Sequence, residues 1–169
     1  FDTINHKKLM DRLREKVSDS SLLKLIEKFL QQGVLDDLEF WTPEEGCPQG
    51  AVISPLLANI YLNPLDHLMA EAGYQMVRYA DNFVILCRTP KYAQHALEQV
   101  QKWVDENDLT LHPSKTRIVD ASEEIFDFLG YRFKKKDVRL PRPKSEAKFK
   151  DAVRAKTKRK NGDSLPYII

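Results

Sequence analysis

The most informative part of this sequence is Gln75-Met76-Val77-Arg78-Tyr79-Ala80-Asp81-Asn82-Phe83-Val84-Ile85-Leu86-Cys87. Residues with high strand propensity lie on both sides of a short polar segment, which predicts two strands joined by a tight hairpin turn. Asp and Asn tolerate the positive φ that such turns demand. Asp81 at the tip is therefore open to two interpretations, an ordinary turn residue or a rigidly held, solvent-near carboxylate suited to a divalent metal ion.

A second motif lies upstream of this hairpin, where Gly46, Pro48 and Gly50 punctuate a loop. Because Gly50 has no side chain, the backbone at Gln49-Gly50 can approach a ligand closely. Ser54 is expected to be the N-cap of the following helix and Pro55 its first residue. On these residues alone, the motif is an ordinary loop that enters a buried helix.

The remaining elements are predicted from the spacing of apolar residues. Helices are expected from Asn5 to Val17, from Asp19 or Ser20 to Gly33, from Ser54 to Ala72 with a kink or split at Pro64, and from Thr89-Pro90 to Val104. In the second helix, the residues that recur at helical spacing are Leu22, Leu25, Ile26 and Phe29. Short strands are expected near Thr110 and over 117–119 and 125–133, with a loop or short hairpin over 36–45. This order predicts an α+β fold in which helices pack on a small, mainly antiparallel sheet.

Charge is distributed unevenly along the chain. The whole sequence has a formal charge of +2, but the segment from Lys134 to Lys160 holds 13 basic and three acidic residues. Ser145 is expected to cap a basic helix in this segment, which carries Phe149 and Val153 and stops at Asn161-Gly162. Such a block attracts a phosphate backbone in a salt-dependent way, or it is a solvated helix face followed by a linker.

The cysteines and the hydropathy exclude some classes of protein. Cys47 and Cys87 show no paired spacing, which argues against a disulfide framework. No apolar run approaches the roughly 20 residues that a membrane-spanning helix needs. The four histidines show no metal-ligand spacing with cysteines, which argues against a zinc site. We therefore expect a soluble, cytoplasmic protein without a membrane partner.

Several motifs, and their order along the chain, resemble those of group II intron-encoded reverse transcriptases, also called maturases. Tyr79-Ala80-Asp81-Asn82 resembles the catalytic hairpin of that family, and Pro48-Gln49-Gly50 with Ser54–Asn59 resembles its template- and nucleotide-facing loop and helix. The other matches are the end of the first catalytic motif at 1–6, the motif that closes the palm at 109–116, the primer-grip hairpin at 126–131 and the opening of the RNA-binding region at 144–169. The five ordered motifs within residues 1–131 are a specific signal, whereas each alone is weak.

The resemblance implies a fold and a division into domains. Residues 1–133 are expected to be the palm of a right-hand polymerase without its fingers. Residues 134–169 are expected to be a basic linker and the start of the thumb or maturase RNA-binding region, a basic helical C-terminal extension.

The resemblance also implies roles for individual residues. Asp81 is the expected metal ligand, with Asn82 as a weaker partner. Phe1 matches the residue that gates the nucleotide sugar, although a core aromatic is an equal alternative, and Gln49 and Gly50 would lie along the template base and the nascent pair.

Lys115 would approach the leaving pyrophosphate, or it is an exposed turn lysine. Arg78 would contact phosphate, or it is a solvated charge. The remaining implied sites are the primer grip at Phe128, Leu129 and Gly130, for which buried strand aromatics are the competing interpretation, and RNA contacts at Lys148, Lys150, Arg154, Lys156, Lys158, Arg159 and Lys160.

Two departures from the family pattern affect the metal site. The first motif of the family carries a metal-binding aspartate about five residues before the Phe-Asp pair, so this ligand would lie before Phe1. The second aspartate of the hairpin is replaced by Asn82, whose amide oxygen can bind a hard cation but carries no charge. The two-Mg²⁺ site of the intact protein is therefore incomplete here, and we expect this piece to be inactive alone.

Three functions are consistent with these motifs. The first is an RNA-directed DNA polymerase of a mobile group II intron that also acts as a maturase, with intron RNA, RNA template, DNA primer and deoxynucleoside triphosphates as partners. The second is a catalytically decayed relative that binds RNA and assists splicing. The third is another palm-fold enzyme such as a nucleotidyl cyclase, which is disfavoured because the expected Gly-Gly-rich loop is missing and Pro48-Gln49-Gly50 is left unexplained.

Overall fold

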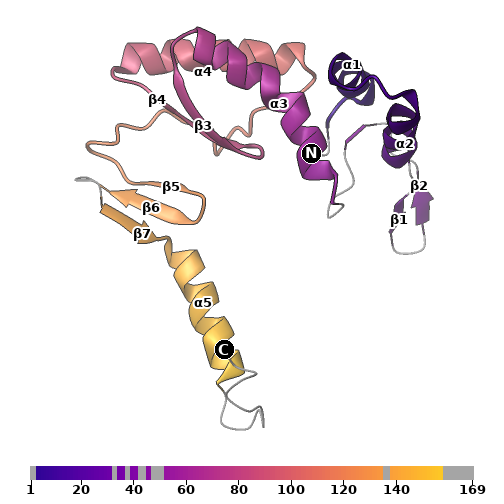
Figure 1. Cartoon of the computed structure of the whole chain (residues 1–169). Helices are drawn as coiled ribbons and strands as arrows, with labels where there is room; N and C mark the ends of the chain where they lie inside the picture. The colour runs from indigo at the N-terminus through magenta and orange to yellow at the C-terminus, as the bar shows by residue number, and fades with distance from the viewer. Residues whose placement is uncertain are drawn as a thin grey trace. The chain divides into compact units, whose positions relative to one another are not determined.

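The chain is mixed α+β in the computed structural model, which describes residues 3–31, 34–36, 39–41, 45–46, 52–134 and 138–157 (Figure 1). Five helices and three small antiparallel sheets lie in these residues. The chain consists of two compact units, Phe1–Ile118 and Val119–Ile169. Each unit is described by itself. The α+β class is confirmed, but the described strands form three separate sheets where one was expected. The proposed domain division between residues 133 and 134 stays a prediction.

Two capped helices begin the first unit. Helix α1 spans His6–Lys16, and the Asn5 side chain accepts a hydrogen bond from the backbone N–H of Lys8 at 3.1 Å. Helix α2 spans Ser20–Leu30, and the Asp19 carboxylate accepts from the N–H groups of Ser21 and Leu22. Both caps confirm the prediction, because a side-chain oxygen satisfies backbone donors that have no partner inside the helix. The predicted stop at Gly33 lies outside the described residues.

Helix α2 turns only part of its apolar surface toward the core. It buries Ile26 and Leu30, whereas Leu22 and Leu25 are 43% and 64% exposed. Phe29 packs against the edge of the core. The apolar residues of this helix are thus spread over more than the width of its contact with the core, and Leu22 and Leu25 lie outside that contact.

A short hairpin follows α2. Strand β1 (Val34–Asp36) pairs antiparallel with β2 (Glu39–Trp41), with Val34 opposite Trp41. This pairing confirms the short-hairpin alternative for the start of segment 36–45.

The long helix α3 spans Ser54–Glu71 and continues through Pro64 without splitting. Its N-cap is Ile53 and not Ser54, which is a buried first residue of the helix with 4% exposure. The helix ends at its C-cap Ala72, and Gly73 follows with φ of 78°, a value that favours glycine. Helix α4 spans Pro90–Glu106 and is capped by the Thr89 hydroxyl, as predicted.

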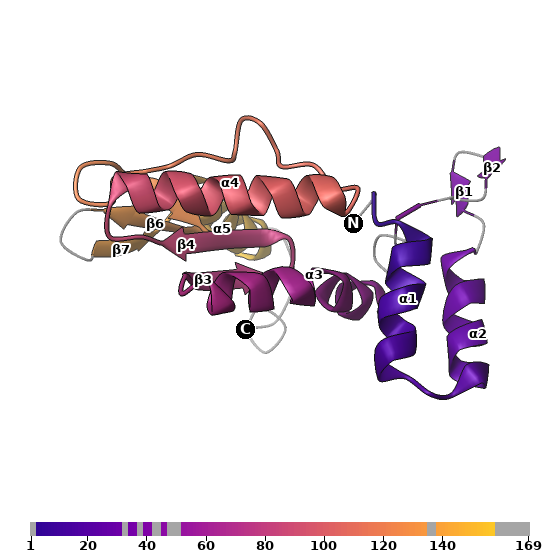
Figure 2. The ribbon, with the colours of Figure 1, turned by 90° about the horizontal axis from the view of Figure 1, so that it is seen from above.

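The hairpin between α3 and α4 is confirmed, with β3 (Gln75–Tyr79) antiparallel to β4 (Asn82–Leu86). Helices α3 and α4 lie over the same side of it (Figures 1 and 2). Met76, Phe83 and Ile85 pack against a buried cluster on the helices, which consists of Leu65, Met69, Tyr74, Ala96, Val100, Trp103 and Val104. On the other side, Val77 and Tyr79 are 51% and 67% exposed. The period-2 pattern thus fixes which face is buried.

A polar cluster joins α1 to α3 and α4. The Arg12 guanidinium lies 4.2 Å from the centroid of the Tyr61 ring and donates to the Tyr61 carbonyl and the Asn107 side chain. The Tyr61 hydroxyl donates to the Asn107 carbonyl at 2.7 Å, and Lys8 pairs with Asp108 at 2.8 Å. Burial lowers the pKa of Arg12 and raises the pKa of Tyr61. These contacts fix helix α1 against α3 and the C-terminal end of α4.

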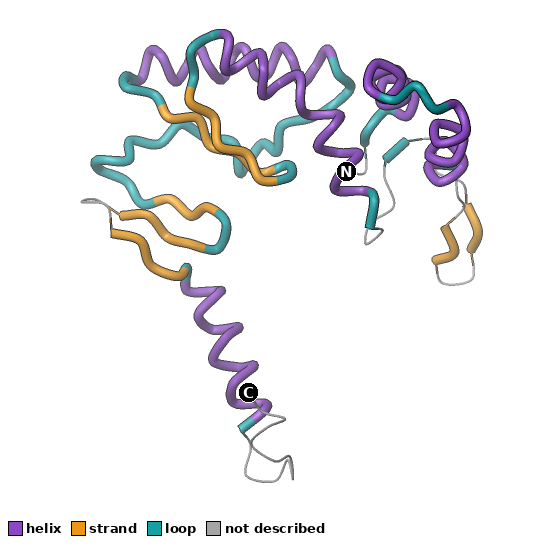
Figure 3. Tube along the Cα trace, in the orientation of Figure 1, coloured by secondary structure: helices purple, strands orange, loops and turns teal. Residues whose placement is uncertain are grey.

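Residues 109–125 contain no strand, so the strands predicted near Thr110 and over 117–119 were wrong (Figure 3). The backbone forms turns instead, with Thr116 N–H donating to the His112 carbonyl at 3.0 Å and Glu124 N–H to the Asp120 carbonyl at 2.7 Å. Leu109 and Leu111 pack against the buried cluster as parts of a loop. A strand assignment requires a paired neighbour, which residue propensity cannot supply.

The second unit is a three-stranded sheet followed by a helix. Strand β6 (Tyr131–Lys134) lies between β5 (Phe126–Phe128) and β7 (Val138–Pro141), and the rings of Phe126 and Phe133 stack at 5.0 Å. Strand β7 was not predicted. Helix α5 spans Pro143–Lys156 with Arg142 as N-cap, so the assignment of Ser145 as cap was wrong. The predicted stop at Asn161-Gly162 lies outside the described residues.

Among the described residues, no helix is long and apolar enough to span a membrane.

The orientation of α2 can be tested by truncating one leucine on its buried face and one on its exposed face. We expect Leu30→Ala to lower the free energy of unfolding by about 2–5 kcal/mol, because Leu30 is 1% exposed and its loss leaves a cavity. Leu25→Ala on the same helix should change it by about 0.5 kcal/mol or less. Urea unfolding measures both values, and equal costs would contradict the observed orientation of the helix.

Candidate active site

The tip of the β3–β4 hairpin is a two-residue loop of Ala80 and Asp81, because Tyr79 pairs with Asn82. The positive φ occurs at Ala80 (54°) and not at Asp81 or Asn82, which corrects the expectation from turn chemistry. A positive φ at only the first loop residue is the pattern of a type II′ turn, whose twist matches that of the flanking strands. Asp81 is exposed at this tip, as predicted.

The side chain of Asn82 is bound to that of Asp81. The Asn82 Nδ2 donates to Asp81 Oδ1 at 2.9 Å, so the amide nitrogen faces the carboxylate. Rotation of the Asn82 amide by about 180° would break this hydrogen bond and exchange the positions of its nitrogen and oxygen atoms. Both groups then offer oxygen atoms of the kind that Mg²⁺ prefers.

The described residues contain no group of three or more His, Cys, Asp or Glu side chains that could hold a metal ion. Asp81 therefore fits one position in a metal site, while the full set of ligands is not present in the described part of the chain. Mg²⁺ in polymerase-type sites is bound by one or two carboxylates together with substrate phosphates, so a single carboxylate at the hairpin tip is compatible with that chemistry.

Arg78 is a structural residue rather than a solvated charge. Its side chain is 11% exposed and forms an ion pair with Asp66 of α3. The guanidinium also donates to Asn59 Oδ1 and to the Ala80 carbonyl, each at 2.8 Å. Asp66 was not predicted as a functional residue and Asn59 was given no contact of its own, although their spacing of seven residues, about two helical turns, places them on one face of α3.

Lys115 lies in an exposed turn, with its backbone N–H donating to the His112 carbonyl at 3.2 Å. This position agrees with the turn-lysine alternative and leaves the ammonium group accessible to solvent. Its proposed contact with pyrophosphate stays a prediction. Phe1, Gln49, Gly50, Lys158, Arg159 and Lys160 lie outside the described residues, so their roles also stay predictions.

The proposed primer grip is a second tight turn, between β5 and β6. Leu129 and Gly130 both have positive φ, 48° and 83°, the pattern of a type I′ turn. A leucine in this conformation is uncommon, and Leu129 is 46% exposed at the tip. The Gly130 carbonyl accepts from the N–H of Arg142, the N-cap of α5, at 2.9 Å. The turn is thus tied to the helix, while Phe128 is half-buried and its contact with a primer stays a prediction.

A bidentate ion pair crosses the strands beside this turn. Arg132 donates to both carboxylate oxygens of Asp127, at 2.9 and 3.1 Å. The hydrogen bond to the Asp127 side chain raises the pKa of Arg132.

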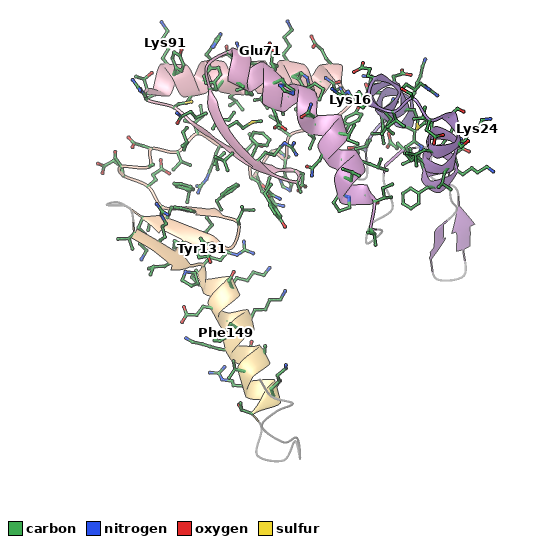
Figure 4. The ribbon with its side chains drawn as sticks, viewed as in Figure 1. Lys16, Lys24, Glu71, Lys91, Tyr131 and Phe149 are labelled. Carbon is green, nitrogen blue, oxygen red and sulfur yellow. The ribbon has the colours of Figure 1, made fainter. Side chains whose placement is uncertain are left out.

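Helix α5 presents its basic side chains to solvent, and part of that charge is neutralised. Lys148, Lys150, Arg154 and Lys156 are all exposed. Lys150 pairs with Glu146 at 2.6 Å, which holds the pKa of that carboxyl below its usual value, and Arg154 pairs with Asp151 at 3.2 Å. Phe149 projects from the helix and is 69% exposed (Figure 4).

Comparison with known families identifies the class of this protein. Residues 1–133 match the family described as reverse transcriptase (RNA-dependent DNA polymerase). The chain therefore belongs to the reverse transcriptase family, as its motifs indicated.

Relatives within this family include intron-encoded proteins. The chain is 30% identical over 171 residues to Protein YkfC of Escherichia coli (strain K12), a match to 80% of this chain and 45% of YkfC. It is also 30% identical to the group II intron-encoded protein LtrA of Lactococcus lactis subsp. cremoris, over 83% of this chain and 21% of LtrA. A solved partial Cas6-RT-Cas1–Cas2 complex matches 70% of this chain at 33% identity with a TM-score of 0.37. The chain thus spans less than half the length of the relatives it matches.

The type I′ turn predicts how Gly130 responds to substitution. A Cβ at Gly130 would lie 3.3 Å from Ser145 Oγ, a hydroxyl that can rotate away, so the positive φ should dominate the cost. We expect Gly130→Ala to destabilise the hairpin by about 1–2 kcal/mol. Gly130→Asn places a Cβ at the same point but tolerates this φ, and should cost less. Hydrogen exchange over β5 and β6 measures the destabilisation that each substitution causes. Equal destabilisation by the two would mean that the contact with Ser145 dominates.

Proposed function

We propose that this chain is the palm and the start of the RNA-binding region of a group II intron-encoded reverse transcriptase. The observation that carries the proposal is the position of Asp81, exposed at the tip of a rigid hairpin in a chain of the reverse transcriptase family. The 30% identity to LtrA supports the intron-encoded origin. The right-hand polymerase palm is the architecture that this family membership suggests for the first unit.

The proposed reaction is template-directed nucleotidyl transfer. A primer 3′-hydroxyl attacks the α-phosphate of a deoxynucleoside triphosphate, a new phosphodiester bond forms, and pyrophosphate leaves. Asp81 would hold Mg²⁺, assisted by the amide oxygen of Asn82, and the metal would stabilise charge on the attacking and leaving oxygens. Lys115 would neutralise the pyrophosphate.

The other residues of the site would bind the nucleic acid and the nucleotide. Phe1 would exclude a 2′-hydroxyl, Gln49 and Gly50 would lie along the template base, and the turn at Leu129-Gly130 would support the primer terminus. The basic segment from Lys134 to Lys160 would bind intron RNA during splicing, the maturase role, because 13 basic residues attract phosphates.

A second candidate function is an RNA-binding splicing factor without polymerase activity. Asn82 favours it, because an uncharged amide stands beside Asp81 and turns its nitrogen toward that carboxylate. An RNA-binding protein would need only the fold and the basic segment.

Primer extension on an RNA template separates the two candidates. We expect Mg²⁺-dependent extension by the protein in its full natural length, abolished by Asp81→Ala and increased by Asn82→Asp, which adds a second carboxylate. Asp11→Ala, which removes another exposed carboxylate, is the control and should leave extension unchanged.

The two outcomes of that assay have separate meanings. Extension that survives Asp81→Ala would contradict the assignment of Asp81. Absence of extension in every variant, with RNA binding retained, would favour the splicing factor.

The RNA contact of α5 can be tested through its dependence on salt. We expect Lys148→Gln to weaken binding of single-stranded RNA and to reduce the slope of log K against log[salt] by about 0.7. The double variant Glu146→Gln/Lys150→Gln removes an ion pair without changing the net charge and should leave the slope nearly unchanged. A slope that Lys148→Gln does not alter would place the RNA elsewhere.

A further inference from the structure

One guanidinium group connects the tip of the candidate catalytic hairpin to the buried helix α3. Arg78 Nε donates to Asp66 Oδ1 at 2.8 Å, and Nη2 donates to Asp66 Oδ2. Nη1 donates both to Asn59 Oδ1 and to the carbonyl oxygen of Ala80, each at 2.8 Å. The bidentate pair with Asp66 fixes the plane of the guanidinium, and this plane aims Nη1 at the turn.

Helix α3 supplies a rigid base for this contact. Leu57, Ala58, Tyr61, Leu65 and Met69 are buried on it, at 2% exposure or less. Asn59 and Asp66 lie between these anchors along the helix. Their side chains are therefore held by an element whose own position is fixed by two buried clusters.

The bond to Ala80 acts directly on Asp81. The carbonyl of Ala80 belongs to the peptide group that continues to the N and Cα atoms of Asp81, and this group is planar. Holding its oxygen thus fixes the plane that contains the Cα of Asp81. Ala80 has a positive φ of 54°, a conformation that a non-glycine residue keeps only when its surroundings enforce it.

We propose that Arg78, Asp66 and Asn59 form a positioning unit that sets the direction of the Asp81 carboxylate for metal-dependent nucleotidyl transfer. The role of Asp81 rests on the proposed function, but the unit itself rests on the contacts of Arg78. Arg78 is a positioning residue and not a phosphate ligand, since its side chain is 11% exposed and its donors face protein acceptors.

The test uses the protein in its full natural length with two substitutions that keep a folded hairpin. Arg78→Lys keeps a positive charge for Asp66, but a lysine cannot hold Asp66, Asn59 and the Ala80 carbonyl in one plane. Asp66→Asn removes the charged acceptor. The matched control is Asp108→Asn, which removes a carboxylate from the 2.8 Å ion pair with Lys8, away from the hairpin.

Kinetics and thermal unfolding are measured together for each variant. We expect Arg78→Lys and Asp66→Asn to lower kcat about 10- to 100-fold, as a displaced catalytic group does, and to raise the Mg²⁺ concentration for half-maximal extension. The KM for the nucleotide and the unfolding midpoint of Arg78→Lys should stay close to those of the parent protein. Asp108→Asn should leave kcat and the Mg²⁺ dependence unchanged. A kcat and Mg²⁺ dependence unaffected by either substitution would overturn the proposal.

Failure of the positioning unit is distinguishable from failure of the proposed function. If Asp81→Ala abolishes extension while Arg78→Lys and Asp66→Asn behave like the parent, the function stands and the unit is wrong. If the parent does not extend primers, hydrogen exchange of the backbone amides of Tyr79–Phe83 tests the positioning unit instead. Exchange at least about 10-fold faster in Asp66→Asn than in Asp108→Asn would support the unit, and equal exchange would overturn it.

Discussion

The candidate site depends on the attachment of the β3–β4 hairpin to helix α3. Burial of Met76, Phe83 and Ile85 against α3 and α4 fixes the face of the hairpin, and the ion pair between Arg78 and Asp66 fixes its tip. An isolated two-stranded hairpin is only marginally stable in water, so the helices are what make the tip rigid. A carboxylate at a rigid tip can keep its direction without losing conformational entropy at each binding event.

Local sequence signals predicted much of this arrangement. Strand-forming residues on both sides of a short polar turn predicted the hairpin, and the Asn5, Asp19 and Thr89 side chains predicted three helix starts. These features depend on residues close together in the chain, where propensity and capping apply directly. The family resemblance, carried by five ordered motifs, was confirmed by the match over residues 1–133.

The features that the sequence did not predict depend on contacts between distant residues. Arg78 was interpreted as a phosphate contact or a solvated charge because its partner, Asp66, lies 12 residues away on another element. Strand β7 was missed because it is only four residues long and ends at Pro141, a residue type depleted in strands, and it forms by pairing with β6. The exposure of Leu22 and Leu25 was not predictable, because periodicity gives an apolar face but not the width of its contact with the core.

The central claim is that Asp81 at the hairpin tip binds the catalytic metal ion. The most direct test replaces Mg²⁺ with Fe²⁺ in the full-length protein bound to primer and template, and maps the backbone cleavage caused by hydroxyl radicals formed at the metal. We expect cleavage within the hairpin around Tyr79–Phe83, suppressed by excess Mg²⁺ and absent in Asp81→Ala. Cleavage that avoids this hairpin, or that persists unchanged in Asp81→Ala, would contradict it.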